Sequence, residues 1–281
     1  MSSSLSPEQQ TDLAELARQI RINSLKAIHQ AKSGHPGGSC SAAEILAVLY
    51  GAVLKHRPTE PGWAERDRLV ISKGHASPAI YSVLALQGYY PLAEFLSGFR
   101  QLGSPYQGHI DASKVAGVEF STGSLGHGLS AANGMALGLR LDRSPVQVYA
   151  LLSDGELQEG QTWEAAMAAA HYQLGNLTAI VDRNRIQLDG FTEQTMALEP
   201  LADKFKAFGW AVTELAGHDL NALYSALQSA RERPASAPPT LILANTIKGQ
   251  GISFMADQVK WHGSAPNDEQ LSAALTELSA S

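Results

Sequence analysis

The sequence predicts an α/β protein in which helices cover both faces of a parallel β-sheet. Short apolar runs alternate along the chain with longer segments of helical periodicity. These runs are apolar throughout rather than at alternate positions, which is typical of strands that are buried on both faces. Helical connections join strands that run in the same direction. The 281 residues are enough for one large core, and we expect a single domain over residues 1–281.

Five strands and five helices are predicted in the order that this fold class requires. The strands are rich in β-branched residues and span residues 68–72, 146–153, 176–182, 209–215 and 239–246. The helices show the 3.6-residue period of apolar positions and span residues 13–31, 40–54, 77–88, 128–141 and 160–173. The Pro-bearing stretch at 231–239 is short enough to be a loop between a helix and a strand.

Composition excludes several classes of function. The net charge of −6, the pI near 5.8 and the lack of a long Lys or Arg run argue against nucleic acid and anionic membrane as partners. Cys40 is the only cysteine, so neither an internal disulfide nor a thiolate-rich metal site is expected. The polar start and the lack of eighteen consecutive apolar residues argue against a signal peptide and a membrane span. We expect a cytoplasmic protein.

Polar residues follow two of the predicted strands. Asp154 follows the second strand, and Asn184 and Ile186 follow the third. A strand-helix-strand unit places the ends of two parallel strands side by side, where ligands bind. A carboxylate, an amide oxygen and a backbone carbonyl suit Mg²⁺ or Ca²⁺, and Gly155 allows a phosphate to approach the backbone. The spacing predicts a metal-phosphate site at this edge of the sheet.

The segment that holds these residues, "SDGELQEGQTWEAAMAAAHYQLGNLTAIVDRNRIQLDG", resembles the thiamine diphosphate motif of the transketolase family. That motif opens with Gly-Asp-Gly and closes about thirty residues later near an Asn; Ser153 replaces its first Gly. The resemblance implies the diphosphate-binding (PP-type) fold and the cofactors thiamine diphosphate and Mg²⁺, with Ca²⁺ as an alternative ion. It also implies that Asp154, Asn184 and the carbonyl of Ile186 are the metal ligands.

Further segments resemble the same family in the same order. They contain "SGHPGGS", "SKGHAS", "GHIDAS", "STGSLGHG", "TIKGQG" and "WHGSAP", so the resemblance extends over roughly residues 15–270. It implies that His35, His109 and His262 are catalytic residues that line a sugar channel. The implied cofactor-binding residues are His75, Gly123, Leu125, Asp154, Gly155, Glu159, Asn184, Lys248 and His262.

Some of these positions have equally good structural interpretations. Leu125 can be a core residue, Glu159 can be a solvated acid at a helix start, and the role of His127 is open. Glu156 is predicted to be a helix-start carboxylate without a functional role. Four other histidines are expected to be surface or core residues: His29, His56, His171 and His218.

The resemblance implies a transferase that works with a second chain. The pyrimidine-binding and C-terminal domains of transketolases have no counterpart in this sequence, so we expect them on a partner subunit, in an α₂β₂ complex. The pair would move a two-carbon ketol unit from a ketose phosphate to an aldose phosphate in the pentose phosphate pathway. Two alternatives stay open: the same chemistry on a less common sugar or in a biosynthetic carboligation, and a non-catalytic scaffold that binds thiamine diphosphate.

Overall fold

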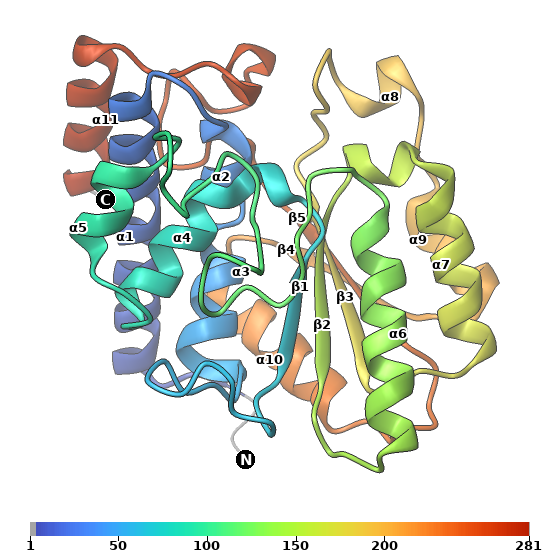
Figure 1. Cartoon of the computed structure of the whole chain (residues 1–281). Coiled ribbons are helices and arrows are strands. Elements are labelled where there is room, and N and C mark those ends of the chain that lie inside the picture. The colour runs from blue at the N-terminus through green and yellow to red at the C-terminus, as the bar shows by residue number, and fades with distance from the viewer. Residues whose placement is uncertain (1–3, 281) are drawn as a thin grey trace.

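The computed structural model describes residues 4–280, which build one parallel sheet between two layers of helices (Figure 1). The strand order is β1-β2-β3-β5-β4, and each neighbouring pair is parallel. The strands are β1 (Arg68–Ile71), β2 (Val148–Ser153), β3 (Leu177–Arg183), β4 (Ala211–Ala216) and β5 (Thr240–Asn245). The predicted fold class and the five predicted strands are confirmed.

The helices lie in two groups on either side of the sheet. Figure 1 shows α6, α7 and α9 against one face and α1, α3, α4 and α10 toward the other. The bounds are α1 (Pro7–Ala31), α2 (Pro36–Ser41), α3 (Ala43–Val48), α4 (Ser77–Leu86), α5 (Leu92–Gly98), α6 (His127–Leu141), α7 (Gly160–His171), α8 (Thr192–Thr195), α9 (Leu201–Phe208), α10 (Leu220–Arg231) and α11 (Asp268–Ala280). Short 3₁₀ turns cover Gly74–Ala76, Gly155–Gln158 and Val259–His262.

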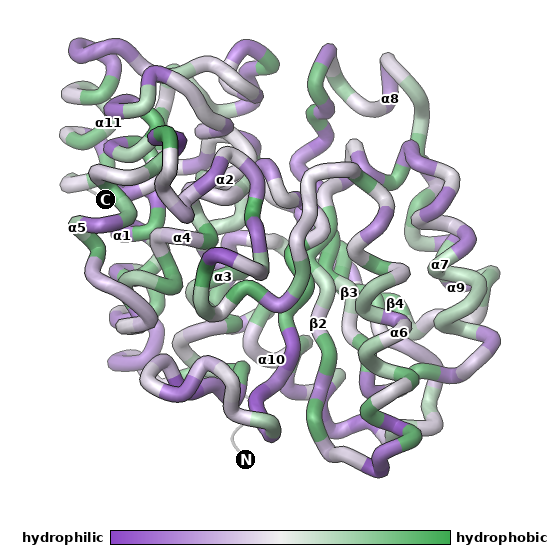
Figure 2. Tube along the Cα trace, viewed as in Figure 1, coloured by the Kyte–Doolittle hydropathy of each residue, from purple (hydrophilic) through white to green (hydrophobic). Residues whose placement is uncertain are grey.

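Successive residues of the central strands belong to different cores. Tyr149 and Leu151 of β2 pack into the core shared with α1, α3 and α4. Val148, Ala150 and Leu152 of the same strand pack into the core shared with α6, α7 and α9. This alternation is the period-two geometry of a strand with both faces covered. It explains why the central strands are mostly apolar along their length, as the green colouring along much of the sheet in Figure 2 also indicates.

Some predicted boundaries were wrong for local reasons. The helix predicted at 40–54 is divided at Ala42 into α2 and α3 and ends in a π-helical turn, Leu49–Val53. Helix α1 begins at Pro7, earlier than predicted, because Ser6 and Gln9 form a reciprocal capping box. Helices α5, α8, α9, α10 and α11 had no counterpart in the prediction.

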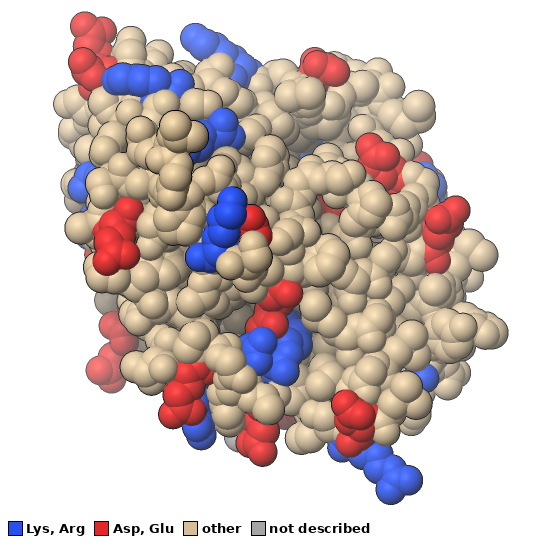
Figure 3. Space-filling view, in the orientation of Figure 1, with Lys and Arg blue, Asp and Glu red and all other residues tan. Residues whose placement is uncertain are grey.

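The edge strand β4 differs from the central strands. Each residue of β2 and β3 is buried, whereas β4 has no buried residue. On the face shown in Figure 3, acidic and basic side chains are scattered among a largely uncharged surface. Among residues 4–280, no helix is both long and apolar enough to cross a membrane.

Because both faces of the sheet are buried, truncating a side chain of a central strand should lower the free energy of unfolding substantially. Ile180 of β3 is fully buried, so Ile180→Ala should lower the free energy of unfolding by about 2–5 kcal/mol through lost burial and a cavity. Met167 on α7 is 56% exposed, and Met167→Ala should change it by less than about 0.5 kcal/mol. Urea denaturation of both variants checks this. Equal losses would contradict the packing described above.

Candidate functional site

A cavity of about 370 Å³ lies at the carboxyl ends of the strands. All of the site residues predicted from the sequence line it: His35, His75, His109, Gly123, Leu125, Asp154, Gly155, Glu159, Asn184, Ile186, Lys248 and His262. Gly38, Ser153, Gln158, Gln187 and Leu188 complete the lining. Segments that are more than two hundred residues apart in the sequence therefore meet around one space, where open parallel sheets bind ligands.

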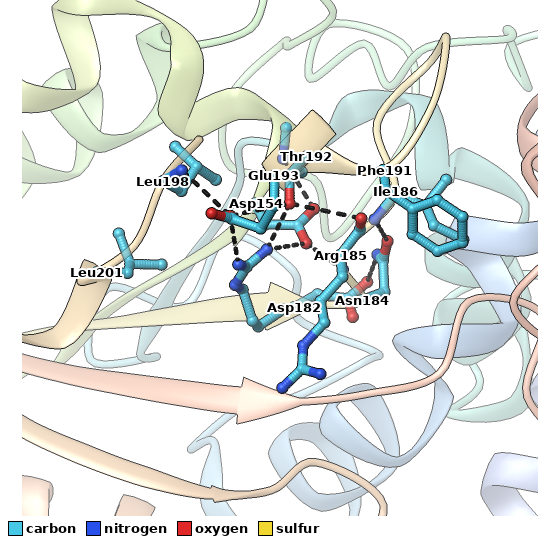
Figure 4. Close-up of polar contacts among 12 residues, drawn as sticks. Asp154, Asp182, Asn184, Arg185, Ile186, Phe191, Thr192, Glu193, Leu198 and Leu201 are labelled. Carbon is cyan, nitrogen blue, oxygen red and sulfur yellow. Dashed lines mark hydrogen bonds and ion pairs between the residues drawn. The ribbon is translucent and has the colours of Figure 1, made fainter. Parts of the chain in front are cut away.

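Asp154 joins the ends of β2 and β3. Its Oδ1 accepts a hydrogen bond from the Gly155 amide at 2.8 Å, and its Oδ2 accepts one from Arg183 Nη1 at 3.1 Å. The amide of Arg185 also donates to Oδ2 (Figure 4). Burial and then the nearby Asp182 carboxylate raise the pKa of Asp154, while Arg183 opposes them. The predicted proximity of Asp154 to the 184–186 segment is thus present.

The amide side chain of Asn184 is held in one orientation. Its Nδ2 donates to Asp182 Oδ2 at 3.3 Å, and its Oδ1 accepts the Ile186 amide at 3.2 Å (Figure 4). The carbonyl of Ile186 accepts a hydrogen bond from Lys248 Nζ at 3.0 Å. A carboxylate, an amide oxygen and a carbonyl therefore adjoin one another at the cavity wall.

Arg183 ties the segment after β3 back to the sheet. Its guanidinium donates to Asp154 Oδ2, to Thr192 Oγ1 at 2.9 Å, to Glu193 Oε1 at 3.0 Å and to Glu199 Oε1 at 2.8 Å. These partners outweigh burial and raise the pKa of Arg183. The guanidinium therefore fixes α8 and its flanking loops beside the carboxylate of Asp154.

A buried ion pair that the sequence did not reveal lies under the cavity. Lys73 and Asp182 are fully buried and paired with each other. Lys73 Nζ also donates to the Gly38 carbonyl at 3.0 Å, and Asp182 accepts hydrogen bonds from Ser41 and Thr246. Burial alone would raise the pKa of Asp182, but Lys73 keeps it lowered. This network joins β1, α2, β3 and the end of β5.

Glu156 lies in the first turn of the 3₁₀ helix Gly155–Gln158, as the sequence predicts, and its side chain also has a structural role that the sequence did not reveal. Its side chain is fully buried and pairs with Ser72 Oγ after β1. It also accepts the amides of Gly126 at 2.9 Å and Ser153 at 3.3 Å. Burial raises the pKa of Glu156. The acid therefore holds the loop of Gly123 and Leu125 against the strand ends. The sequence signal for this role is the position of Glu156, which closely follows a strand that is buried throughout.

Four histidines converge at the other end of the cavity. The ring centroid of His35 lies 5.4 Å from that of His75, 6.0 Å from that of His109 and 5.5 Å from that of His262. The rings of His75 and His262 are stacked at 5.5 Å. Their four segments are far apart in the sequence, and the fold brings them together as the resemblance implied.

Burial and nearby cations keep these imidazoles neutral. Burial, followed by the charge of Arg100, lowers the pKa of His35 to about 4. Burial, followed by Lys248, lowers the pKa of His262 to about 3. The pKa values of His75 and His109 are lowered too, in each case chiefly by burial. Neutral imidazoles have both a donor and an acceptor nitrogen, so the cluster offers both at neutral pH.

The remaining predicted residues occupy different surroundings. Lys248 is buried, which lowers its pKa to about 8, and its Nζ lies 2.7 Å from His262 Nδ1. Leu125 is half-buried and Glu159 is exposed. A Cβ at position 155 would lie 2.9 Å from the Cβ of Gln187, so the glycine is required by a neighbouring side chain.

The histidines without a predicted role also have varied environments. His127 is exposed at the start of α6 and does not line the cavity. His29 pairs with Asp268, and His171 is exposed on α7. His218 is mostly buried and pairs with Glu44. Of the two expected environments, surface or core, it therefore has the second.

The surroundings of Glu156 predict a difference between two acids of one segment. Glu156→Ala should destabilise the chain by about 1–3 kcal/mol for each donor left unpaired. Glu159→Ala removes an exposed carboxylate and should change stability by less than about 0.5 kcal/mol. Chemical denaturation measures both. If the two variants proved equally stable, the buried role of Glu156 would be wrong.

The lowered pKa of His35 predicts a pH-dependent stability. Below about pH 6.5 the unfolded chain binds a proton at His35, while the folded chain does so only near pH 4. Stability from this residue is therefore present above pH 6.5 and lost as the pH falls toward 4. His35→Asn should lose less stability than the unchanged chain between pH 7 and pH 5 in urea titrations. His171→Asn, at an exposed position, is the control and should follow the unchanged chain.

Known proteins are similar to this chain over most of its length. Residues 13–280 match the family model "Transketolase, thiamine diphosphate binding domain". The chain is 45% identical to the 6-deoxy-6-sulfo-D-fructose transketolase subunit SqwG of Clostridium sp. (strain MSTE9), covering 96% of this chain and 98% of that protein. It is 39% identical to one of the subunits of the apulose-4-phosphate transketolase of Phocaeicola vulgatus, covering 91% of this chain and 89% of that protein.

A solved structure agrees with the fold as well. Transketolase from Leishmania mexicana superposes with a TM-score of 0.89 at 33% identity, over 95% of this chain and 41% of that chain. The match is therefore to one part of a long transketolase, whereas the two subunits named above are matched over most of their length. With a family model matched over residues 13–280, this chain belongs to the transketolase family, in which it represents the thiamine diphosphate-binding domain.

Proposed function

We propose that the cavity binds the diphosphate end of Mg²⁺-thiamine diphosphate and that, with a partner subunit, the chain transfers a two-carbon ketol unit between sugar phosphates. The observation that carries this proposal is the meeting of all the predicted site residues around one cavity at the carboxyl ends of the strands. The names of two relatives, which denote subunits of transketolases with more than one chain, support a partner.

The donor groups fit a metal ion with a diphosphate. Asp154, Asn184 and the Ile186 carbonyl would hold Mg²⁺, or Ca²⁺ in its place, because all three present hard oxygen atoms. Asp154 Oδ2 and the Ile186 carbonyl each accept a hydrogen bond from a cationic side chain, Arg183 or Lys248. These oxygen atoms therefore lie where positive charge is favoured. Lys248 and His75, which also line the cavity, would bind the diphosphate.

The histidines would act on the sugar. Bound thiamine diphosphate supplies the carbanion chemistry of ketol transfer. His35, His109 and His262 would orient the sugar hydroxyls and hold or accept their protons, since neutral rings can donate and accept. His35 Nδ1 is buried and has no hydrogen-bond partner among residues 4–280, so it is available for such a contact.

The partner would complete the ring end of the cofactor site. Gly123 and Leu125 line the cavity beside exposed Glu159, and we place the thiamine rings and the partner's pyrimidine-binding domain at this end. We propose two copies of each chain in the complex. Residues 1–281 would thus act as a single diphosphate-binding domain in a larger assembly.

The same ketol transfer chemistry can act on different sugars, so the substrate is a separate question. Relatives at 45% and 39% identity are named for a sulfonated fructose and for apulose 4-phosphate. These names favour a less common sugar as the second candidate, beside the pentose phosphates. An assay of the assembled complex with each ketose distinguishes them, and ligation without any sugar phosphate would indicate the biosynthetic alternative.

Asp154 provides the direct test of the metal site. Asp154→Asn keeps the size of the side chain but removes its charge, and should weaken Mg²⁺-dependent thiamine diphosphate binding by the assembled complex on the order of 100-fold. Asp189→Asn, at an exposed position of the same segment, is the matched control and should bind normally. Isothermal calorimetry with and without Mg²⁺ measures both. Unchanged affinity in Asp154→Asn would refute the assignment.

The need for a partner is tested by mixing experiments. The purified chain should have little ketol transfer activity, and the addition of its partner should restore it. Full activity of the chain alone would refute the two-chain proposal. Binding of thiamine diphosphate by a complex that stays inactive on every ketose tested would favour the scaffold alternative.

A further inference from the structure

A series of polar contacts connects α1 to the loop that carries Lys248. Arg21 on α1 donates to both oxygens of Glu44 on α3, at 2.7 and 2.5 Å. Glu44 Oε2 lies 2.8 Å from His218 Nδ1. His218 Nε2 lies 2.8 Å from the amide nitrogen of Ile247. Residues of four segments thus meet in one series of contacts that ends at Ile247, the neighbour of Lys248.

The hydrogen-bond partners of His218 determine which of its two ring nitrogens carries the proton. The Ile247 amide can only donate, so His218 Nε2 must be unprotonated and accept. The ring proton therefore lies on Nδ1 and is donated to Glu44. Burial acts to raise the pKa of Glu44, but the His218 hydrogen bond and the charge of Arg21 leave it lowered. An ionised Glu44 thus fixes both the orientation and the tautomer of His218.

Ile247 is the neighbour of the residue that reaches the candidate metal site. Lys248 Nζ donates to the Ile186 carbonyl, and the rest of its loop is held by backbone bonds. The Gly249 amide donates to the Gly37 carbonyl at 3.1 Å, and the Asp257 amide donates to the Lys248 carbonyl at 2.9 Å. On the N-terminal side, the Thr246 amide donates to the Arg183 carbonyl at 3.1 Å. Between these backbone bonds, the amide of Ile247 donates to the imidazole of His218.

We propose that His218 is a positioning residue that, held by Glu44 and Arg21, fixes the Ile247 amide and so keeps the ammonium group of Lys248 on the Ile186 carbonyl. Its role is indirect, since the ring does not line the cavity. The proposal goes beyond the proposed function by adding a support outside the cofactor site, and it rests on that function only for its consequence for cofactor affinity.

The accessibility of Lys248 to chemical labelling tests the proposal without any cofactor. Lys248 is 2% exposed, so acetic anhydride should acetylate it slowly in the folded chain. His218→Phe keeps a ring but removes the acceptor, and the adjoining cavity of about 500 Å³ offers room for it. This variant should raise the acetylation rate of Lys248, and the amide exchange of residues 245–251, about tenfold.

Two matched variants separate positioning from general damage. His218→Gln offers a side-chain carbonyl to the Ile247 amide and should restore most of the protection. His171→Phe removes an exposed histidine on α7 and should leave Lys248 protected. Equal acetylation of Lys248 in His218→Phe and in the unchanged chain would overturn the proposal. So would equal loss of protection in His218→Phe and His218→Gln. If His218→Phe does not fold, the comparison of His218→Gln with His218→Leu decides.

Cofactor binding by the assembled complex is a separate readout. His218→Phe should weaken Mg²⁺-thiamine diphosphate binding about tenfold, and His218→Gln should recover it. If the unchanged complex binds no thiamine diphosphate, the proposed function is wrong, while the labelling result still decides the role of His218. If Lys248 loses protection but cofactor affinity is unchanged, the positioning role in the site is overturned.

Discussion

The structure of the site depends on the buried carboxylate of Asp182. This side chain at the end of β3 accepts hydrogen bonds from Lys73, Ser41, Thr246 and Asn184. An isolated buried charge is very costly, and a buried ion pair is tolerated only when its remaining hydrogen-bonding groups are satisfied. Asp182 meets this condition because three other segments meet the end of its own strand at one point. The positions of α2, the end of β1 and the loop after β5 follow from that requirement.

The strands and the position of Asp154 can be predicted from the sequence because both depend on local pattern and on the geometry of neighbouring parallel strands. Asp154 and Asn184 each follow a buried strand of one strand-helix-strand unit, so their proximity is a consequence of topology. The pairing of Lys73 with Asp182 could not be predicted in this way, since 109 residues separate them and β1 is not a neighbour of β3. Only the packed structure shows that this lysine is buried.

The two acids after β2 show how environment, rather than residue type, divides roles. Asp154 lines the cavity and faces cationic donors, whereas Glu156, two residues later, turns into the protein and binds the amides of Gly126 and Ser153. A sequence places both near a strand end and cannot tell which side chain points outward. The 3₁₀ turn at Gly155–Gln158 makes the difference, because its tight geometry turns Glu156 back toward β1.

The division of charge in the cavity follows from these supports. Lys73, Lys248 and Arg183 are each held by a carboxylate or a carbonyl at the strand ends, so fixed positive groups lie at or beneath the end of the cavity where we propose that the diphosphate binds. Burial, together with the charges of Lys73 and Lys248, depresses the pKa values of His75 and His262. Lys73 and Lys248 thus contribute positive charge near the proposed diphosphate site and, together with burial, keep the imidazoles beside it neutral. Displacing Lys248, as in a chain that lacks the His218 support, would therefore alter both ends of the cavity together.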